Sequence, residues 1–183
     1  MAEGDVTPAS GVATPADWSG DVLLTDGRSV HLRWITPSDR DALRAFHESL
    51  SDRTVYLRFF TPKRSLSDAD LDYFTGVDHH DRVALVAIDD GVLVGVCRFD
   101  ALGDGSAEVA FVIRDDIQGR GLGSLLLEHL AEVARQCGIE RFRAEVLPDN
   151  MAMLATFRAS GYDIKQRRDM DVVVVDFAVG TAP

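Results

Sequence analysis

The chain has 183 residues, of which 46% are hydrophobic and 27% are charged, as expected of one soluble globular domain. Its formal net charge of -11 argues against a nucleic-acid partner, because phosphate binding needs a surplus of Lys and Arg on one face. No stretch approaches the roughly 20 apolar residues of a membrane span, and no basic segment followed by an apolar one opens the chain. We therefore expect neither a membrane partner nor a secretory signal.

The first part of the chain changes from unpatterned to periodic sequence. Residues 1–20 are rich in Gly, Ala, Ser, Thr and Pro without a hydrophobic period, so we expect a mobile arm before a single domain over residues 21–183. Apolar residues alternate from Val30 to Ile35, which predicts a strand. Polar caps followed by apolar residues at helical spacing then predict three short helices, which begin near Thr36, Ser51 and Ser67.

The rest of the chain predicts six strands and two helices. Strands are expected over 83–88, 92–99, 108–113, 142–147, 162–167 and 172–177, and helices over 122–137 and 150–160. The strand-helix-strand unit over 108–147 implies a right-handed crossover between parallel strands, whereas Asp90-Gly91 indicates an antiparallel hairpin. The order predicts an α+β fold, in which helices flank a central mixed, mostly antiparallel sheet.

Two cysteines occur, Cys97 in a strand pattern and Cys137 on the apolar side of a helix pattern. They form no CxxC pair and no disulfide framework. We interpret both as small buried side chains in a reducing cytoplasm.

The segment that carries chemistry joins a predicted strand to the longer predicted helix. It reads Gln118-Gly119-Arg120-Gly121-Leu122-Gly123-Ser124. Glycines let the backbone approach a ligand with its N–H groups, the helix adds its positive N-terminal end, and Arg120 can add a charged contact. The segment predicts a pyrophosphate cradle, although a tight turn without a ligand is an alternative. A Walker loop would need a lysine directly before Ser124, and a Rossmann fingerprint would need a glycine at the position of Ser124.

This segment resembles the Q/R-x-x-G-x-G/A signature of the GNAT superfamily of acyl-CoA N-acyltransferases. The stretch from Asn150 through Phe157 to Gly161-Tyr162 is similar to the next motif of that family. Residues 51–60, with 77–80 after them, look like the catalytic domain of bacterial Pat-type protein lysine acetyltransferases, which modify acyl-CoA synthetases. The resemblance covers roughly residues 30–177 and implies a GNAT-like fold, acetyl-CoA as cosubstrate and a primary amine as acceptor.

The resemblance also implies roles for individual residues. The backbone from Gln118 to Ser124 would hold the pyrophosphate. The backbone of Phe111, Val112 and Ile113 would pair with the pantetheine arm like an added strand. Asn150 would hydrogen-bond the pantetheine region. Phe157 stands where the family often has a tyrosine as general acid, so the thiolate would leave with a proton from water or another group, or without one.

Glu108 is the only charge in the apolar stretch over residues 107–113, just before the cofactor segment. An ammonium must lose a proton before it attacks, and a carboxylate at this point can accept that proton as general base. The resemblance to Pat-type enzymes, which have a glutamate at this site as base, supports this role. The alternative is a carboxylate on a solvated strand face.

The acceptor side is expected around Tyr56, Phe60, His79 and His80, because the glycine turn already serves the cofactor. The histidine pair has no third ligand at useful spacing, so we expect no metal site. A protein lysine is the favoured acceptor, and the negative net charge is compatible with it. A small-molecule amine acceptor and an acetyl-CoA-binding sensor without turnover remain alternatives, and the oligomeric state is open between monomer and homodimer.

Overall fold

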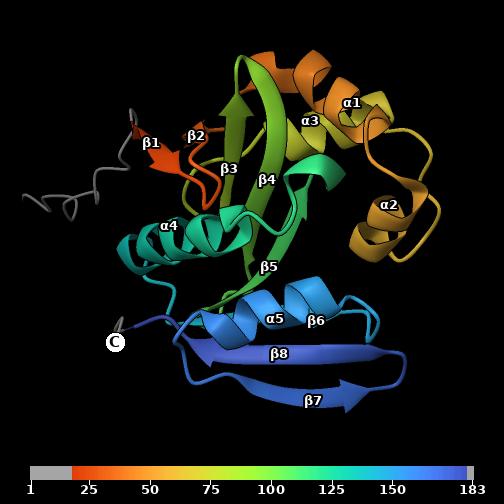
Figure 1. The fold of residues 1–183 in the computed structure, drawn as a ribbon. Coiled ribbons are helices and arrows are strands. Elements are labelled where there is room, and N and C mark those ends of the chain that lie inside the picture. The colour runs from red at the N-terminus through yellow and green to blue at the C-terminus, as the bar shows by residue number, and fades with distance from the viewer. Residues whose placement is uncertain (1–17, 181–183) are drawn as a thin grey trace, which may run out of the picture.

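A computed structural model describes residues 18–180 of the chain, and it folds around one sheet of eight strands (Figure 1). The strand order is β1-β2-β3-β4-β5-β6-β8-β7. The strands are β1 Ser19–Leu23, β2 Ser29–Trp34, β3 Arg82–Asp89, β4 Val92–Ala101, β5 Ser106–Ile113, β6 Arg141–Val146, β7 Lys165–Asp169 and β8 Val172–Ala178. The α-helices are α1 Arg40–Glu48, α2 Asp52–Phe59, α3 Asp68–Thr75, α4 Leu122–Gln136 and α5 Met151–Ala159.

The pairing of the strands confirms the predicted α+β fold. β5 and β6 are parallel and are joined through α4, whereas the other neighbouring strands are antiparallel. The Asp90-Gly91 turn joins β3 to β4, and both residues have positive φ, 47° and 77°, as a two-residue hairpin turn requires.

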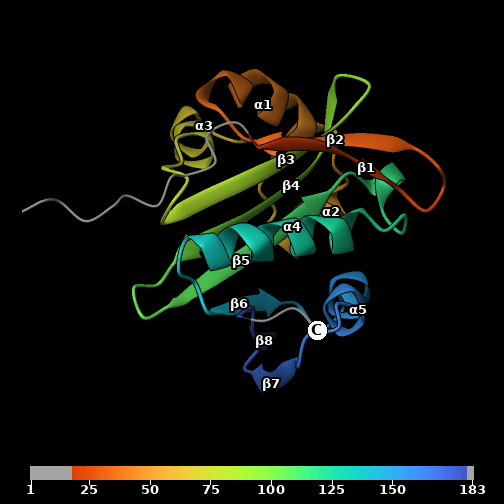
Figure 2. The same cartoon turned by 90° about the vertical axis from the view of Figure 1, so that its left-hand side faces the viewer.

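Helices cover both faces of the sheet. Figure 2 shows α1 and α3 on one side of β2–β4 and α4 on the other. The larger core lies on the α4 side, where Leu122, Leu126 and Leu130 repeat every four residues and are buried. A smaller core, with Phe46 and Leu71, lies under α1 and α3. Among residues 18–180, no helix is long and apolar enough to cross a membrane.

Two predicted boundaries need correction. The predicted arm over residues 1–20 ends too late, because Ser19 and Gly20 belong to β1, an exposed edge strand that pairs with β2. The rest of that arm, residues 1–17, lies outside the described residues. β7 begins at Lys165 rather than at Tyr162, because Tyr162 and Ile164 pack against the larger core before the strand starts.

Candidate functional site

The site begins where two neighbouring strands separate. β5 and β6 are paired only at Ser106–Glu108 with Arg141–Arg143, and beyond these residues they diverge. From Val109 to Ile113, β5 is paired with β4 on one side, and none of the described strands pairs with it on the other. The free edge of β5 therefore presents backbone N–H and C=O groups to whatever enters the gap, as the edge of a sheet does for an added strand.

A cleft of about 290 Å³ occupies this gap. Its walls come from α2, from both diverging strands and from α5. The lining residues are Leu57, Arg58, Phe59, Phe60, Glu108, Val109, Ala110, Phe111, Ala144, Glu145, Val146, Asn150, Met153 and Phe157. The cleft brings together residues from Leu57 to Phe157, and five of them belong to the predicted site: Phe60, Glu108, Phe111, Asn150 and Phe157.

Glu108 lies where the two strands part, and its side chain is exposed. In the sheet it is paired with Asp100 of β4 and with Arg143 of β6. Asp100 is held by Arg98, with Nε and Nη2 at 3.0 Å from its carboxylate oxygens. Within residues 18–180, by contrast, the Glu108 carboxylate has neither a hydrogen bond nor an ion pair. It is therefore free to accept a proton from a group in the cleft.

The glycine turn lies at the other end of β5 and leads into α4. Gly119 and Gly121 have positive φ, 73° and 86°, which a residue with Cβ adopts only at a cost. Residues 118 and 119 form a turn, and within the described part of the chain the backbone N–H groups of Gly119 and of Gly121 to Ser124 have no protein acceptor. These free donors, at the positive end of a 15-residue helix, fit the predicted binding of a pyrophosphate.

The hairpin of β1 and β2 supports this turn. The N–H of Thr25 donates to the carbonyl of Arg120 at 3.1 Å, and a Cβ on Gly121 would lie 3.3 Å from the Thr25 methyl group. The Arg120 guanidinium hydrogen-bonds the Asp26 carboxylate and the Asp116 carbonyl. The sequence indicates that this side chain can add a charged contact to a phosphate; in the structure it hydrogen-bonds Asp26, and this bond lowers the pKa of Asp26.

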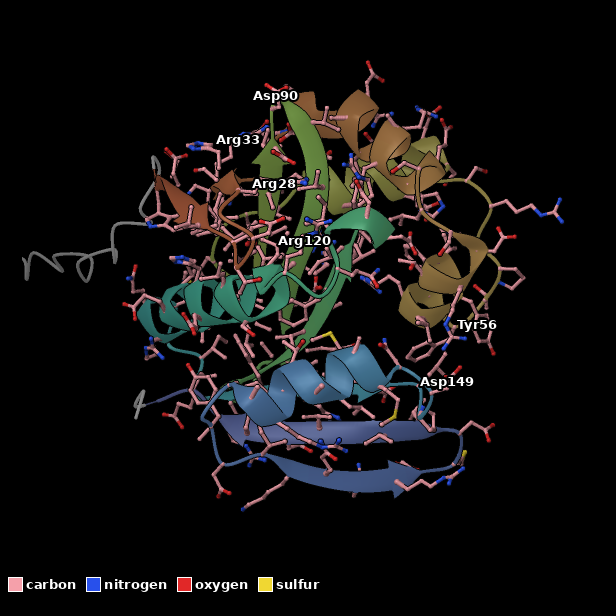
Figure 3. All side chains as sticks on the ribbon, in the orientation of Figure 1. Arg28, Arg33, Tyr56, Asp90, Arg120 and Asp149 are labelled. Carbon is pink, nitrogen blue, oxygen red and sulfur yellow. The ribbon has the colours of Figure 1, made fainter. Side chains whose placement is uncertain are left out.

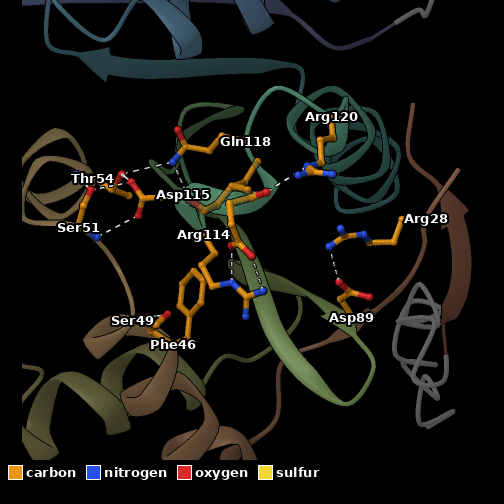
Figure 4. A network of polar contacts seen from close by, with 12 residues as sticks. Arg28, Phe46, Ser49, Ser51, Thr54, Asp89, Arg114, Asp115, Gln118 and Arg120 are labelled. Carbon is orange, nitrogen blue, oxygen red and sulfur yellow. Dashed lines mark hydrogen bonds and ion pairs between the residues drawn. The ribbon is translucent and has the colours of Figure 1, made fainter. Parts of the chain in front are cut away.

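A polar network joins the glycine turn to α2 (Figure 4). Asp115 accepts hydrogen bonds from the Ser51 N–H at 2.9 Å and from the Thr54 hydroxyl at 2.7 Å. The amide of Gln118 donates to the Ile113 carbonyl at 2.9 Å and to the Thr54 hydroxyl at 3.3 Å. Partial burial raises the pKa of Asp115, but the hydrogen bonds from Ser51 and Thr54 outweigh it and hold the pKa below its usual value. The network fixes the start of α2 relative to the turn.

The start of α5 forms the opposite wall of the cleft. The side-chain oxygen of Asn150 caps α5 by accepting from the Met153 N–H at 3.2 Å. Its NH₂ group has no partner among the described residues, so it can donate to a ligand in the cleft. Phe157 is fully buried and packs edge-on against Phe111, with ring centroids 6.0 Å apart.

Only part of the predicted acceptor side lies at the cleft. Phe60 lines it, whereas Tyr56 is 46% exposed and outside the lining. Figure 3 shows Tyr56 and Asp149 on the same side of the molecule, and the ion pair of Arg53 with Asp149, at 3.6 Å, links α2 to the loop before α5 there.

The structure separates the histidine pair from Tyr56 and Phe60. His79 packs against Trp34, with ring centroids 5.2 Å apart, and its carbonyl faces Cys137, so it lies on the α4 side of the sheet. His80 is exposed and hydrogen-bonds Asp81. Neither histidine lines the cleft. Within residues 18–180, no group of three or more His, Cys, Asp or Glu side chains could hold a metal ion.

Sequence reasoning missed two charged residues of the cleft. Glu145 follows Arg143 by two positions on β6, so it lies on the same face of the sheet as Glu108. The alternation of charged and apolar residues in β6 could have shown that this carboxylate lies on the same face of the strand as Arg143. Arg58 lies in the last turn of α2, and no sequence signal marks it.

Comparison with known proteins assigns the family. Residues 34–162 match the profile of the Acetyltransferase (GNAT) family. Acetyltransferase PA5475 of Pseudomonas aeruginosa is 36% identical over 144 residues, which cover 76% of this chain and 77% of that protein. Acetyltransferase Pat of Mycolicibacterium smegmatis is 34% identical over 165 residues, and these cover 86% of this chain but only 48% of that protein. The crystal structure of the GNAT domain of S. lividans PAT superposes with a TM-score of 0.85 at 43% identity, covering 90% of this chain and 98% of that one.

Proposed function

The chain belongs to the acetyltransferase (GNAT) family and is an acetyl-CoA-dependent N-acetyltransferase, and we propose that its acceptor is a lysine side chain of a protein. The similarity to two Pat proteins, one of them at 43% identity over 90% of this chain, supports this proposal. The negative net charge of -11 supports it too, because it attracts a cationic side chain. The acyl-CoA synthetases that Pat-type enzymes modify are the first acceptors to test. We also propose that this protein acts in the cytoplasm.

The arrangement of the cleft fits acetyl-CoA, which supplies an activated acetyl group as a thioester. The free N–H groups of Gly119 and of Gly121 to Ser124 would hold the pyrophosphate. The open edge of β5 from Val109 to Ile113 would pair with the pantetheine arm, and the Asn150 NH₂ group would donate to it. An N–H of the same edge would also stabilise the thioester carbonyl oxygen as it gains negative charge.

The free carboxylate of Glu108 is the observation that carries the proposed mechanism. Glu108 would take the proton of the lysine ammonium, directly or through water, and the neutral amine would attack the thioester carbonyl. The C–N bond forms as the C–S bond breaks, the attacking nitrogen loses its second proton to water, and CoA leaves as a thiolate that can take up a proton from the solvent. Phe157 has no proton to give, but a thiolate is a good enough leaving group to manage without one.

The chemistry of the lining residues favours direct attack over a covalent acyl-enzyme. Among the described residues that line the cleft, none is Cys, Ser, Thr, His or Lys. Cys97 is fully buried, and burial raises the pKa of its thiol. Burial also raises the pKa of Cys137, which packs at the end of α4. Neither thiol is placed or activated to accept the acetyl group.

The acceptor class is tested by incubating the protein with labelled acetyl-CoA and an acyl-CoA synthetase, and in parallel with spermidine. We expect label on a lysine of the synthetase. Label on spermidine and none on protein would identify a small-molecule acetyltransferase. Acetyl-CoA binding without transfer to any amine would instead favour a sensor.

A further inference from the structure

Arg58 is the cation in the wall of the cleft. It lies in the last turn of α2, is half-buried, and separates the cleft from a small apolar cavity of about 40 Å³ under α1 and α3. Phe59 and Ala110 line both spaces beside it. Arg58 therefore lines the same cleft as Glu108, where we expect the acceptor amine.

This guanidinium is not hydrogen-bonded to any anion among the described residues. Among residues 18–180 it has no hydrogen bond and no ion pair, and its contact is the face of the Phe59 ring, 4.9 Å from Cζ to the centroid. The neighbouring Arg98 is different, since it holds Asp100 through two hydrogen bonds of 3.0 Å. Charges that the fold partly withdraws from water, as it does the half-buried Arg58, are normally paired, because losing hydration is costly. Arg58 is thus ready to bind an anion that is not part of the fold.

The charges that surround Arg58 do not supply that anion. Burial, and then repulsion by Arg98, lower the pKa of Arg58 to about 10, although Glu108, Asp100 and Tyr73 act in the opposite direction. Arg58 therefore stays charged at neutral pH. Glu108 attracts it without a hydrogen bond, and Asp100 is occupied by Arg98 and by Arg82, the latter at 3.2 Å.

The position of Arg58 indicates the source of the anion. The phosphates of the cosubstrate would lie at the glycine turn, beyond the other end of β5, whereas α2 is the wall on the acceptor side. An arginine fork matches the two oxygens of a carboxylate. We infer that Arg58 binds a carboxylate of the acceptor close to the amine that is acetylated. The preferred acceptor would then be a lysine with Asp or Glu beside it in the sequence; this rests on the proposed lysine acceptor.

Matched peptides test this inference. One set has a single lysine with Asp at one of the four nearest positions, and a second set has Asn in place of each Asp. With wild-type protein, we expect the best Asp peptide to exceed its Asn partner about 10- to 100-fold in kcat/KM, mainly through KM, as a hydrogen bond between charged groups provides. Arg58→Gln should bring this ratio close to one, and Arg58→Lys should keep only part of it. Arg53→Gln, on the exposed part of the same helix, should leave the ratio unchanged.

Two controls separate the possible failures. The thermal shift with acetyl-CoA should be the same in wild type and Arg58→Gln, which shows that the variant is folded and binds its cosubstrate. If lysine peptides are acetylated but Asp and Asn peptides react equally, the inference is wrong and the lysine acceptor stands. If no lysine peptide or protein is acetylated, the lysine acceptor itself fails. A third result would also overturn the inference: Arg58→Gln binds succinyl-CoA more weakly but acetyl-CoA normally, and wild type acetylates Asp and Asn peptides equally. Arg58 would then bind a carboxylate of the acyl group rather than of the acceptor.

Discussion

Replacing Glu108 by glutamine keeps the size of the side chain and removes its ability to accept a proton. The carboxylate has no hydrogen bond or ion pair among the described residues, although it attracts Arg58 at longer range, so Glu108→Gln breaks no ion pair and should fold normally. Acetyl-CoA binding should also survive, because we assign it to backbone groups at Phe111–Ile113 and Gln118–Ser124. The variant therefore isolates the proton transfer.

The size of the expected defect follows from the ionisation of the acceptor. A lysine ammonium has a pKa near 10.4, so at pH 7.5 only about one amine in 800 is neutral. A base that removes this proton typically contributes about 10²–10⁴ in rate, equivalent to about 3–5 kcal/mol of activation free energy. At pH 9.5 about one amine in nine is already neutral, a gain of about 90-fold. The defect of Glu108→Gln should shrink by a similar factor.

The assay is CoA thiol release from acetyl-CoA with a lysine peptide, measured at pH 7.5 and 9.5. Glu145→Gln is the matched control, because Glu145 lines the same cleft on the same face of the sheet. It should lose much less activity than Glu108→Gln. If Glu108→Gln keeps nearly full activity with normal acetyl-CoA affinity, Glu108 is only a strand-face charge. A large, pH-dependent defect in Glu145→Gln would then identify Glu145 as the base.

Three further predictions concern the turn, α2 and the leaving group. Gly121→Ala and its control Gly103→Ala both place a Cβ at positive φ, 86° and 81°, and each should cost about 1 kcal/mol of stability. Only Gly121→Ala should lose the increase in melting temperature that acetyl-CoA causes. Equal shifts in both variants would argue against the cradle. The pKa of Asp115 is lowered in the folded protein, so its carboxylate should stabilise the fold above about pH 4, and this stabilisation should be lost as the pH falls further. Asp115→Asn should therefore be less stable than wild type at pH 7. In thermal melts the variant should also lack the part of the acid dependence that Asp115 causes. Acid dependence identical to wild type would refute this role. Phe157→Tyr should change the rate far less than Glu108→Gln does, and a large gain in thiol release would show that protonation of the thiolate limits the reaction.

Local pattern was enough to predict most of the secondary structure. The four-residue repeat of Leu122, Leu126 and Leu130 predicts α4 because one helical face must be buried, and the Asp90-Gly91 turn predicts the hairpin of β3 and β4. β1 was missed because Ser19–Leu23 is short and exposed, and it forms only where β2 offers an edge. Glu145 was missed although its strand alternates, because its exposed position looked like any solvated charge.

By itself, the sequence determined the α+β element order, the glycine turn and Glu108 as a lone charge in an apolar strand. These depend on contacts between residues close in the chain. Only the tertiary structure decided that β5 and β6 part after Glu108 and that α2 lines the gap between them. It also decided that Arg120 turns to Asp26, that His79 packs on the far face, and that Arg58 lacks a partner. Loops and helices distant in sequence determine these contacts, and no periodicity encodes which face of the sheet they reach.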